Sequence, residues 1–239
     1  AIDNGTSGIR TNTFTAETSF IPSAADGATL GSSSAEFSDL FLADGGQILF
    51  GNDQEITLTH VADSGLTLKH AATADDKFPT LTLAAGDTDI AADDKLGVIN
   101  FQAPDEGTGT DAILVAAGIE AVSEGDFAAD SNATSLVFKV GASEAATEAM
   151  RIKSNGRVGI GVTPSNDLHI KSSNPVIRLE DSDGSSSIYA QMFSDASGKL
   201  TFRADPGNAA GSSKINFEID GAEVQSIDAS GHILKPLNS

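Results

Sequence analysis

The 239-residue chain contains no cysteine, no tryptophan and one tyrosine. Without cysteine, a disulfide framework, a thiolate metal site and a thiol nucleophile are all excluded, and the redox compartment stays open. The longest nearly apolar run, Ala112 to Ile119, is only eight residues long, far below the roughly 20 that span a bilayer, so we expect no membrane insertion. The chain opens AIDNGTSG, with no initiator methionine and no basic or apolar leader, so we expect a fragment or a trimmed product.

Positive charge is scarce. The chain has 34 acidic and 14 basic residues, a net charge of −20, so we expect neither nucleic acid nor anionic membranes as partners. The net negative charge is unevenly distributed along the chain. Residues 1–150 hold 24 acidic and 5 basic side chains (−19), whereas residues 151–239 hold 10 acidic and 9 basic side chains (−1). We interpret the acidic part as a well-solvated surface that can also repel like-charged neighbours along an assembly.

What is present is mostly a period-two pattern. Apolar residues alternate with threonine or charged residues, which predicts half-buried strands at 47–50, 55–60, 66–70 and 80–83. The best helical segment, 142–150, lies between two strand-like stretches. We expect a hairpin connection there with at most a turn or two of helix. The sequence therefore predicts an all-β fold.

An internal repeat organises the second two-thirds of the chain. Five segments recur in the same order, which predicts two copies of one β-module near residues 78–160 and 174–235. The second copy is shorter and has no counterpart of Gly118 to Asn132, so we expect 110–135 to be a long loop insertion. The matched pairs are 78–83 with 174–179, 97–103 with 198–204, 137–140 with 216–219, 148–152 with 223–227, and 154–158 with 229–233.

Each copy has only about 60–80 residues, a size at which a lone chain buries little apolar surface. We therefore expect neighbouring copies of the chain to complete the core and protect the strand edges. Within that core we expect Phe101 and Phe202 to be buried. The predicted parts are an N-terminal neck or linker module over 1–45, a short β-strand module over 46–77, repeat 1 over 78–165 and repeat 2, with shorter loops, over 166–239.

Two stretches resemble modules of tailed-bacteriophage fibres. One runs from Phe20 to Ser32 and into Glu36 to Gly45, with the pattern LGS followed by F-x-D-L-aromatic-L; the other is Met150 to Pro164, followed by Leu168 to Ile170. The likeness is greatest to fibres of marine phages, particularly those of cyanobacteria, which are typically homotrimers that project from the virion. The resemblance implies elongated, repeated β-modules intertwined as a homotrimeric fibre. In that family a segment like Gly231 to Pro236 often leads into a C-terminal knob.

The resemblance also implies a structural, non-enzymatic role on the extracellular side of the virion. The chain would be a shaft or spacer of a tail or head fibre that presents host-recognition elements for adsorption. Its partners would be copies of itself, other virion proteins, and host cell-surface glycan or protein. Two alternatives stay open: a surface adhesin that binds glycan directly, for example through 110–135, and a depolymerase spike that cleaves polysaccharide.

Motifs for catalysis are missing. The chain has no Gly-x-Ser-x-Gly elbow, P-loop or Gly-x-Gly-x-x-Gly. Asp181 and Asp183 are candidates for the carboxylate pair of a depolymerase, but their setting in a turn-like segment favours an Asx-turn. Oxygen ligands for calcium occur at 181–184 and at two further clusters, without the spacing of the twelve-residue calcium loop; these clusters are Asp87-Thr88-Asp89 and Asp93-Asp94.

The four histidines show no His-x-His spacing. A threefold assembly could place three copies of one histidine around its axis as metal ligands, but the pattern favours ordinary surface or strand-face histidines. We assign no catalytic residue, metal ligand or cofactor from the sequence. The histidines considered are His60, His70, His169 and His232.

Overall fold

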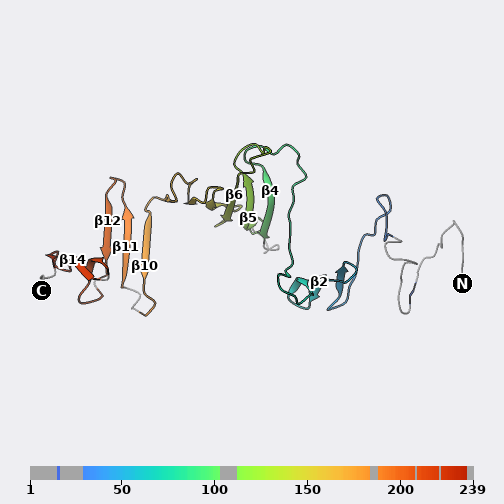
Figure 1. The fold of residues 1–239 in the computed structure, drawn as a ribbon, viewed down its shortest axis with the longest axis horizontal. Helices are drawn as coiled ribbons and strands as arrows, with labels where there is room; N and C mark the ends of the chain where they lie inside the picture. Colours follow the sequence, from blue (N-terminus) through green and yellow to red (C-terminus); the bar gives the residue numbers. More distant parts are fainter. Residues whose placement is uncertain are drawn as a thin grey trace. The chain divides into compact units, whose positions relative to one another are not determined.

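The computed structural model describes residues 15–16, 29–102, 112–183, 188–207, 209–220 and 222–235. These residues form fifteen strands and no helix (Figure 1), so the all-β prediction is confirmed. The chain divides into two compact units, Ala1–Leu81 and Thr82–Ser239. Of the fibre-like stretch at Phe20 to Ser32, residues 20–28 lie outside the described residues, as do 110–111 of the predicted loop insertion.

The first unit contains a three-stranded antiparallel meander. Its strands are β1 (Gln47–Phe50), β2 (Ile56–Val61) and β3 (Gly65–His70). They match three of the strands predicted from period-two alternation to within a residue at each end. Ile48, Leu58 and Leu68 are directly paired across the sheet, so their side chains share one face.

The strand predicted at 80–83 is wrong. The segment belongs to no strand and to no ladder. Its Leu83 lies over Gly97, where an added Cβ would come within 2.9 Å of the Leu83 Cβ. The alternating pattern therefore reflects a side chain packed on a sheet face, without the backbone pairing that a strand needs.

The second unit begins with a six-stranded sheet whose strands follow sequence order. Every neighbouring pair is antiparallel except the parallel pair β8–β9. The β6–β7 hairpin confirms the hairpin connection expected at 142–150. The strands are β4 (Lys95–Gln102), β5 (Val115–Ser123), β6 (Thr134–Val140), β7 (Thr147–Ile152), β8 (Val158–Ile160) and β9 (Leu168–Ile170).

The long loop insertion predicted at 110–135 is also wrong. Residues 115–123 form β5, which pairs with β4 on one side and with β6 on the other. Its alanine-rich sequence gave a weak strand signal, and the shorter second copy made the stretch look dispensable. Hydrogen bonding on both sides instead makes β5 an interior strand, so this stretch cannot be a projecting glycan-binding loop.

Very few apolar side chains are buried. Among the described residues, Val122, Val137 and Ala146 are the buried hydrophobic ones. Phe101 and Phe202, expected in the core, are 54% and 59% exposed. Within one chain these two side chains are therefore not core residues, and their burial in a core shared by several copies stays a prediction.

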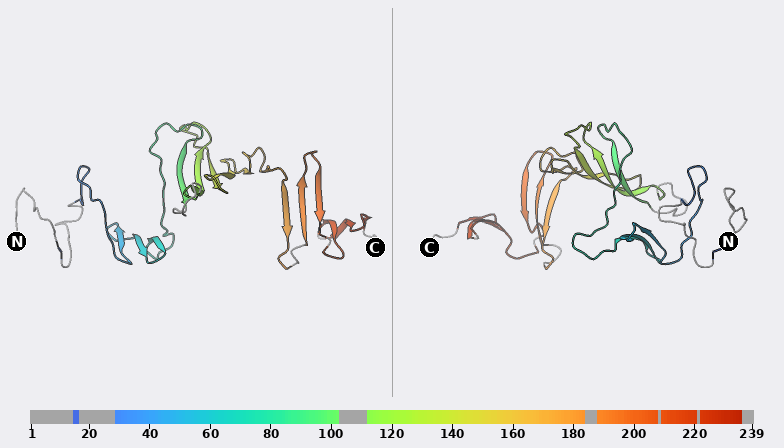
Figure 2. Two further views of the ribbon diagram at one scale, coloured as in Figure 1. Left: turned by 180° about the vertical axis from the view of Figure 1, so that it is seen from behind. Right: turned by 45° about the vertical axis from the view of Figure 1, so that its right-hand side comes forward.

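Two three-stranded antiparallel sheets complete the second unit, and the first of them appears as three orange arrows side by side in Figure 2. It consists of β10 (Val176–Glu180), β11 (Tyr189–Ser194) and β12 (Leu200–Ala204). The last sheet consists of β13 (Lys214–Ile219), β14 (Ala222–Asp228) and β15 (Ile233–Leu234).

The sheet β13–β15 repeats β6–β8 in register. The pair Leu136–Ile152 corresponds to Ile215–Ile227, and a β-bulge follows two residues further along each strand, directly after Phe138 in β6 and Phe217 in β13. The following turns also agree: Gly156 has φ 80° and Gly231 has φ 81°. The last three of the five sequence matches therefore describe one structural unit that occurs twice.

The earlier matches differ in their partners. Segment 174–179 contains β10, whereas its counterpart at 78–83 forms no strand. β12 pairs with β11, whereas its counterpart β4 pairs with β5. The predicted domain boundary at 165/166 stays a prediction.

Candidate functional site

One face of the six-stranded sheet carries only uncharged side chains, most of them apolar. Directly paired residues point to the same side of a sheet, so the ladders define rows of side chains on this face. We call it the apolar face. One row is Ala121, Leu136, Ile152, Val158 and Leu168; the next is Ile99, Ile119, Phe138, Met150, Ile160 and Ile170; a third is Phe101, Ala117 and Val140.

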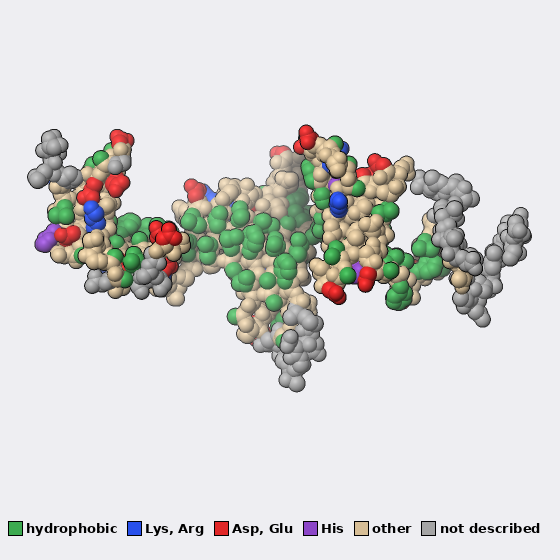
Figure 3. All heavy atoms as spheres, turned by 90° about the horizontal axis from the view of Figure 1, so that it is seen from below, with side chains coloured by type: hydrophobic (Ala, Val, Ile, Leu, Met, Phe, Trp, Pro, Cys, Tyr) green, Lys and Arg blue, Asp and Glu red, His purple; other side chains and the backbone are tan. Residues whose placement is uncertain are grey.

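The apolar face is largely uncovered. A broad patch of hydrophobic side chains is visible near the middle of the view in Figure 3. Six of its large side chains are at least 40% exposed, with Val140 at 56% as the extreme. An exposed apolar area of this extent marks an interaction surface. The six are Ile99, Phe101, Leu136, Val140, Ile160 and Leu168.

The opposite face of the same sheet holds the ion pairs. Oε1 of Glu120 accepts hydrogen bonds from Nζ of Lys95 at 3.0 Å and from Nζ of Lys139 at 3.1 Å. The Glu120 side chain is only 8% exposed. Burial by itself raises the pKa of this carboxyl, but the two lysine ammonium groups outweigh that effect, so the pKa lies below its ordinary value. We call this side the ion-pair face.

A second carboxylate ties the end of β5 to two other segments. Oε1 of Glu124 accepts hydrogen bonds from Oγ of Ser135 and from the backbone N–H of Ser154, both at 2.7 Å. Burial raises its pKa, but these bonds, with Lys153 nearby, outweigh burial and lower the pKa to about 2. Glu124 therefore acts as a structural clip between β6 and the β7–β8 turn.

The sheet β10–β12 is two-sided in the same way. Ile177, Met192 and Phe202 are paired in one row of its apolar side. On the other side, the guanidinium carbon of Arg203 lies 4.7 Å from the ring centroid of Phe193, within the range of a cation–π contact. The division into an apolar side and a polar side thus recurs in both parts of the second unit.

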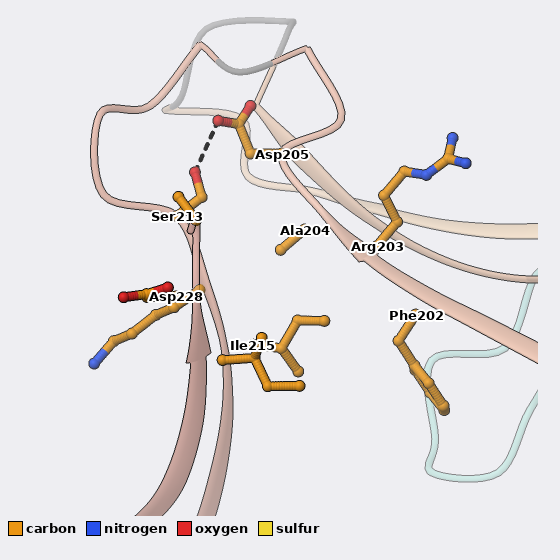
Figure 4. Close-up of a pocket in the computed structure, with 10 residues that line it drawn as sticks. Phe202, Arg203, Ala204, Asp205, Ser213, Ile215 and Asp228 are labelled. Atoms are coloured by element: carbon orange, nitrogen blue, oxygen red, sulfur yellow. Dashed lines mark hydrogen bonds between the residues drawn. The ribbon is translucent and has the colours of Figure 1, made fainter. Parts of the chain in front are cut away.

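A hollow of about 310 Å³ lies between β12 and β13 (Figure 4). Phe202 and Ile215 line one part of it, and Asp205 and Ser213 lie in another part, joined by a hydrogen bond of 2.8 Å. The Asp205 carboxylate also accepts backbone N–H bonds at 3.1 and 2.9 Å. These bonds, the one from the Ala210 N–H first, lower its pKa. The carboxylate therefore organises its own loop and is not presented as a free acid or base.

The acidic pairs singled out in the sequence form turns. The backbone N–H of Asp183 donates to Oδ1 of Asp181 at 2.9 Å, and that of Asp89 donates to Oδ1 of Asp87 at 2.9 Å. These bonds agree with the Asx-turn interpretation. In the other cluster, Asp93 has a left-handed φ of 70°, and Oδ2 of Asp94 accepts from the N–H of Ala91 at 2.7 Å.

The four histidines lie at separate places. Across the described parts of the chain, no three His, Asp or Glu side chains gather in a way that would hold a metal ion. The nearest partners differ from one histidine to the next: Asp44 at 3.6 Å for His60, the Ala72 N–H at 3.2 Å for His70, Ser165 at 3.3 Å for His169, and Asp228 at 3.2 Å for His232.

No protein-family model matches the chain, and no curated protein matches it. A search of the described residues finds no helix that is long and apolar enough to cross a membrane. The described residues define an all-β protein whose six-stranded sheet has a largely exposed apolar face and an opposite face that holds its ion pairs.

Proposed function

We propose that this chain is a structural segment of a phage tail or head fibre. Three copies assemble into a shaft or spacer that carries host-recognition elements away from the virion, on its extracellular side. The observation that supports this proposal is the apolar face of β4–β9, on which six large side chains are at least 40% exposed although Leu83 covers Gly97 at one end. The resemblance of Met150 to Pro164 to a fibre module points the same way.

Among the described residues, the apolar face of the six-stranded sheet has no second sheet packed on it. A sheet gains most of its stability from burying one face, and a three-stranded sheet with that face in water is marginal. Three sheets of this chain have only three strands. Association with other copies supplies the missing layer, which is why an obligate assembly fits these sheets better than a monomer does.

The ion-pair face is the more buried side of the six-stranded sheet within one chain, because Val122, Val137 and Glu120 lie on it and are buried. Glu120 pairs with both Lys95 and Lys139 on the ion-pair face, and the excess of acid in residues 1–150 favours the solubility of that part. The proposed partners are copies of the chain, other virion proteins at the ends of the segment, and host cell-surface glycan or protein. We propose no reaction for this segment.

The test is the native mass of the full chain by analytical ultracentrifugation at micromolar concentration, followed by negative-stain electron microscopy. We expect a mass close to three times 24.3 kDa and rod-shaped particles. A stably folded monomer would contradict the proposal. Release of reducing sugar from bacterial polysaccharide by the purified chain would favour the depolymerase spike instead.

A further inference from the structure

We propose that the apolar face of β4–β9 is the surface through which copies of this chain bind one another. The inference rests on the proposed fibre function and assigns its interface to one side of one sheet. Its rows run without interruption from Ile99 in β4 to Ile170 in β9. The occupant is therefore a second copy of the same chain, seated on a face that spans six strands.

Charge selects this face for self-association. The chain has a net charge of −20, so two copies repel each other wherever their acidic surfaces meet. No strand of the six-stranded sheet places a Lys, Arg, Asp or Glu on the apolar face, since the charged strand residues pair on the opposite side. Identical copies can approach through this face without bringing like charges together or burying an unpaired ion.

The exposed area is large enough for a stable contact. At roughly 100 Å² for each of the six most exposed side chains, the face offers about 600 Å². An interface of standard size takes about 800 Å² from each partner. The partly exposed side chains between them, such as Ile119, Phe138 and Met150, supply the remainder.

The internal repeat favours a repeated partner over an unrelated one. Five large positions of the apolar face are apolar again at the equivalent places of β13–β15. In a shaft built from identical copies, the same kind of contact covers the apolar residues of β4–β9 and those of β13–β15. An unrelated protein would need two separate surfaces, one for each sheet. The equivalent pairs are Leu136 and Ile215, Phe138 and Phe217, Val140 and Ile219, Ile152 and Ile227, and Val158 and Ile233.

Neighbouring residues of β4 allow a matched test in the full chain. Ile99 and Asn100 are both exposed, and they point to opposite faces because they pair with Ile119 and Gly118. Ile99→Glu places a carboxylate on the apolar face, and Asn100→Glu places the same charge on the ion-pair face. We expect Ile99→Glu to raise the concentration for half-dissociation at least tenfold, because every copy would bury the new charge. We expect Asn100→Glu to change it less than threefold.

Ultracentrifugation of the wild type, Ile99→Glu and Asn100→Glu measures the concentration for half-dissociation of each protein. Far-UV circular dichroism is the folding control. Leu168→Glu is a second variant of the apolar face, in its last strand. It should raise the concentration for half-dissociation as Ile99→Glu does. An assembled wild type with an unaffected Ile99→Glu and Leu168→Glu would overturn the interface but leave the fibre proposal standing. A wild type that is monomeric, with Ile99→Glu less stable than Asn100→Glu, would show that the same chain covers the face and would overturn both.

Discussion

Phe138 and Phe217 occupy the same position in two copies of one bulged hairpin. Phe138 pairs with Met150 and Phe217 with Gln225, and in each hairpin the register shifts at the next residue. A β-bulge locally increases the twist of its strand, so both copies turn their following residues in the same way. The exchange of Met150 for Gln225 makes the second copy less apolar at the centre of this face.

Glu124→Gln should destabilise the fold by about 1–3 kcal/mol, because the amide loses the charge that strengthens the hydrogen bonds from Ser135 and Ser154. Thermal or urea unfolding at pH 7 measures the difference. Glu144→Gln is the matched control, since Glu144 is exposed in the β6–β7 connection and its loss of charge should change stability by less than about 0.5 kcal/mol.

The same carboxylate gives a pH dependence. Its pKa is about 2 in the folded protein, below the roughly 4.3 of an unfolded glutamate, so its contribution is fully present above pH 4.3 and is lost as the pH falls toward 2. The stability difference between wild type and Glu124→Gln should therefore shrink over that interval. A difference that stays constant from pH 7 to pH 2.5 would contradict the role given to Glu124.

Glu120 and Lys139 should show a coupling free energy of about 1 kcal/mol in a double-mutant cycle of Glu120→Gln and Lys139→Met. Their side chains are 8% and 25% exposed, so this pair is less screened than a surface ion pair. Lys95, at 52% exposed, should couple to Glu120 more weakly, and raising the salt from 0.05 to 1 M should reduce that coupling further. Equal coupling for both lysines would contradict this ranking.

Gly156→Ala and Gly231→Ala should each cost about 1 kcal/mol of stability. Both glycines have φ near 80° and no atom close to an added Cβ, so the cost is backbone strain alone. Gly125→Ala is the control, because it also has open space and its φ is not in the left-handed region. Chemical denaturation checks all three variants. A neutral result at both Gly156 and Gly231 would contradict the backbone-strain argument, and a loss at only one of them would contradict the equivalence of the two turns.

Ala121→Pro should abolish the six-stranded sheet, a loss of more than about 3 kcal/mol. Ala121 lies in β5 between Gly97 and Leu136, where proline would remove a ladder donor. Ala129→Pro should be tolerated, because Ala129 is the second residue of a turn closed by the Ser131 N–H donating to Ala128 O at 3.2 Å. Circular dichroism measures the loss of strand signal in each variant. If 110–135 were a loop, Ala121→Pro would be tolerated as well as Ala129→Pro.

Alternation and repetition in the sequence were enough to determine the all-β class, the positions of the strands β1, β2 and β3, and the matching segments of β6–β8 and β13–β15. Strands such as Leu66 to His70 carry their own signal, because alternate residues point to opposite faces whatever the partner strand is. The Ser154 to Val158 turn and its counterpart are equally local, since glycine permits the left-handed conformation at the same place in each.

Only the tertiary structure decided the pairing. The sequence of β5 is rich in alanine and glycine, and it becomes a strand because β4 and β6 saturate its backbone on both sides. The strand predicted at 80–83 failed for the opposite reason, since no neighbour pairs with it. The candidate site depends on the same step: Ile99, Phe138 and Leu168 are far apart in the chain, and only the register of six strands places them on one face and the charges on the other, because side-chain direction follows the ladder.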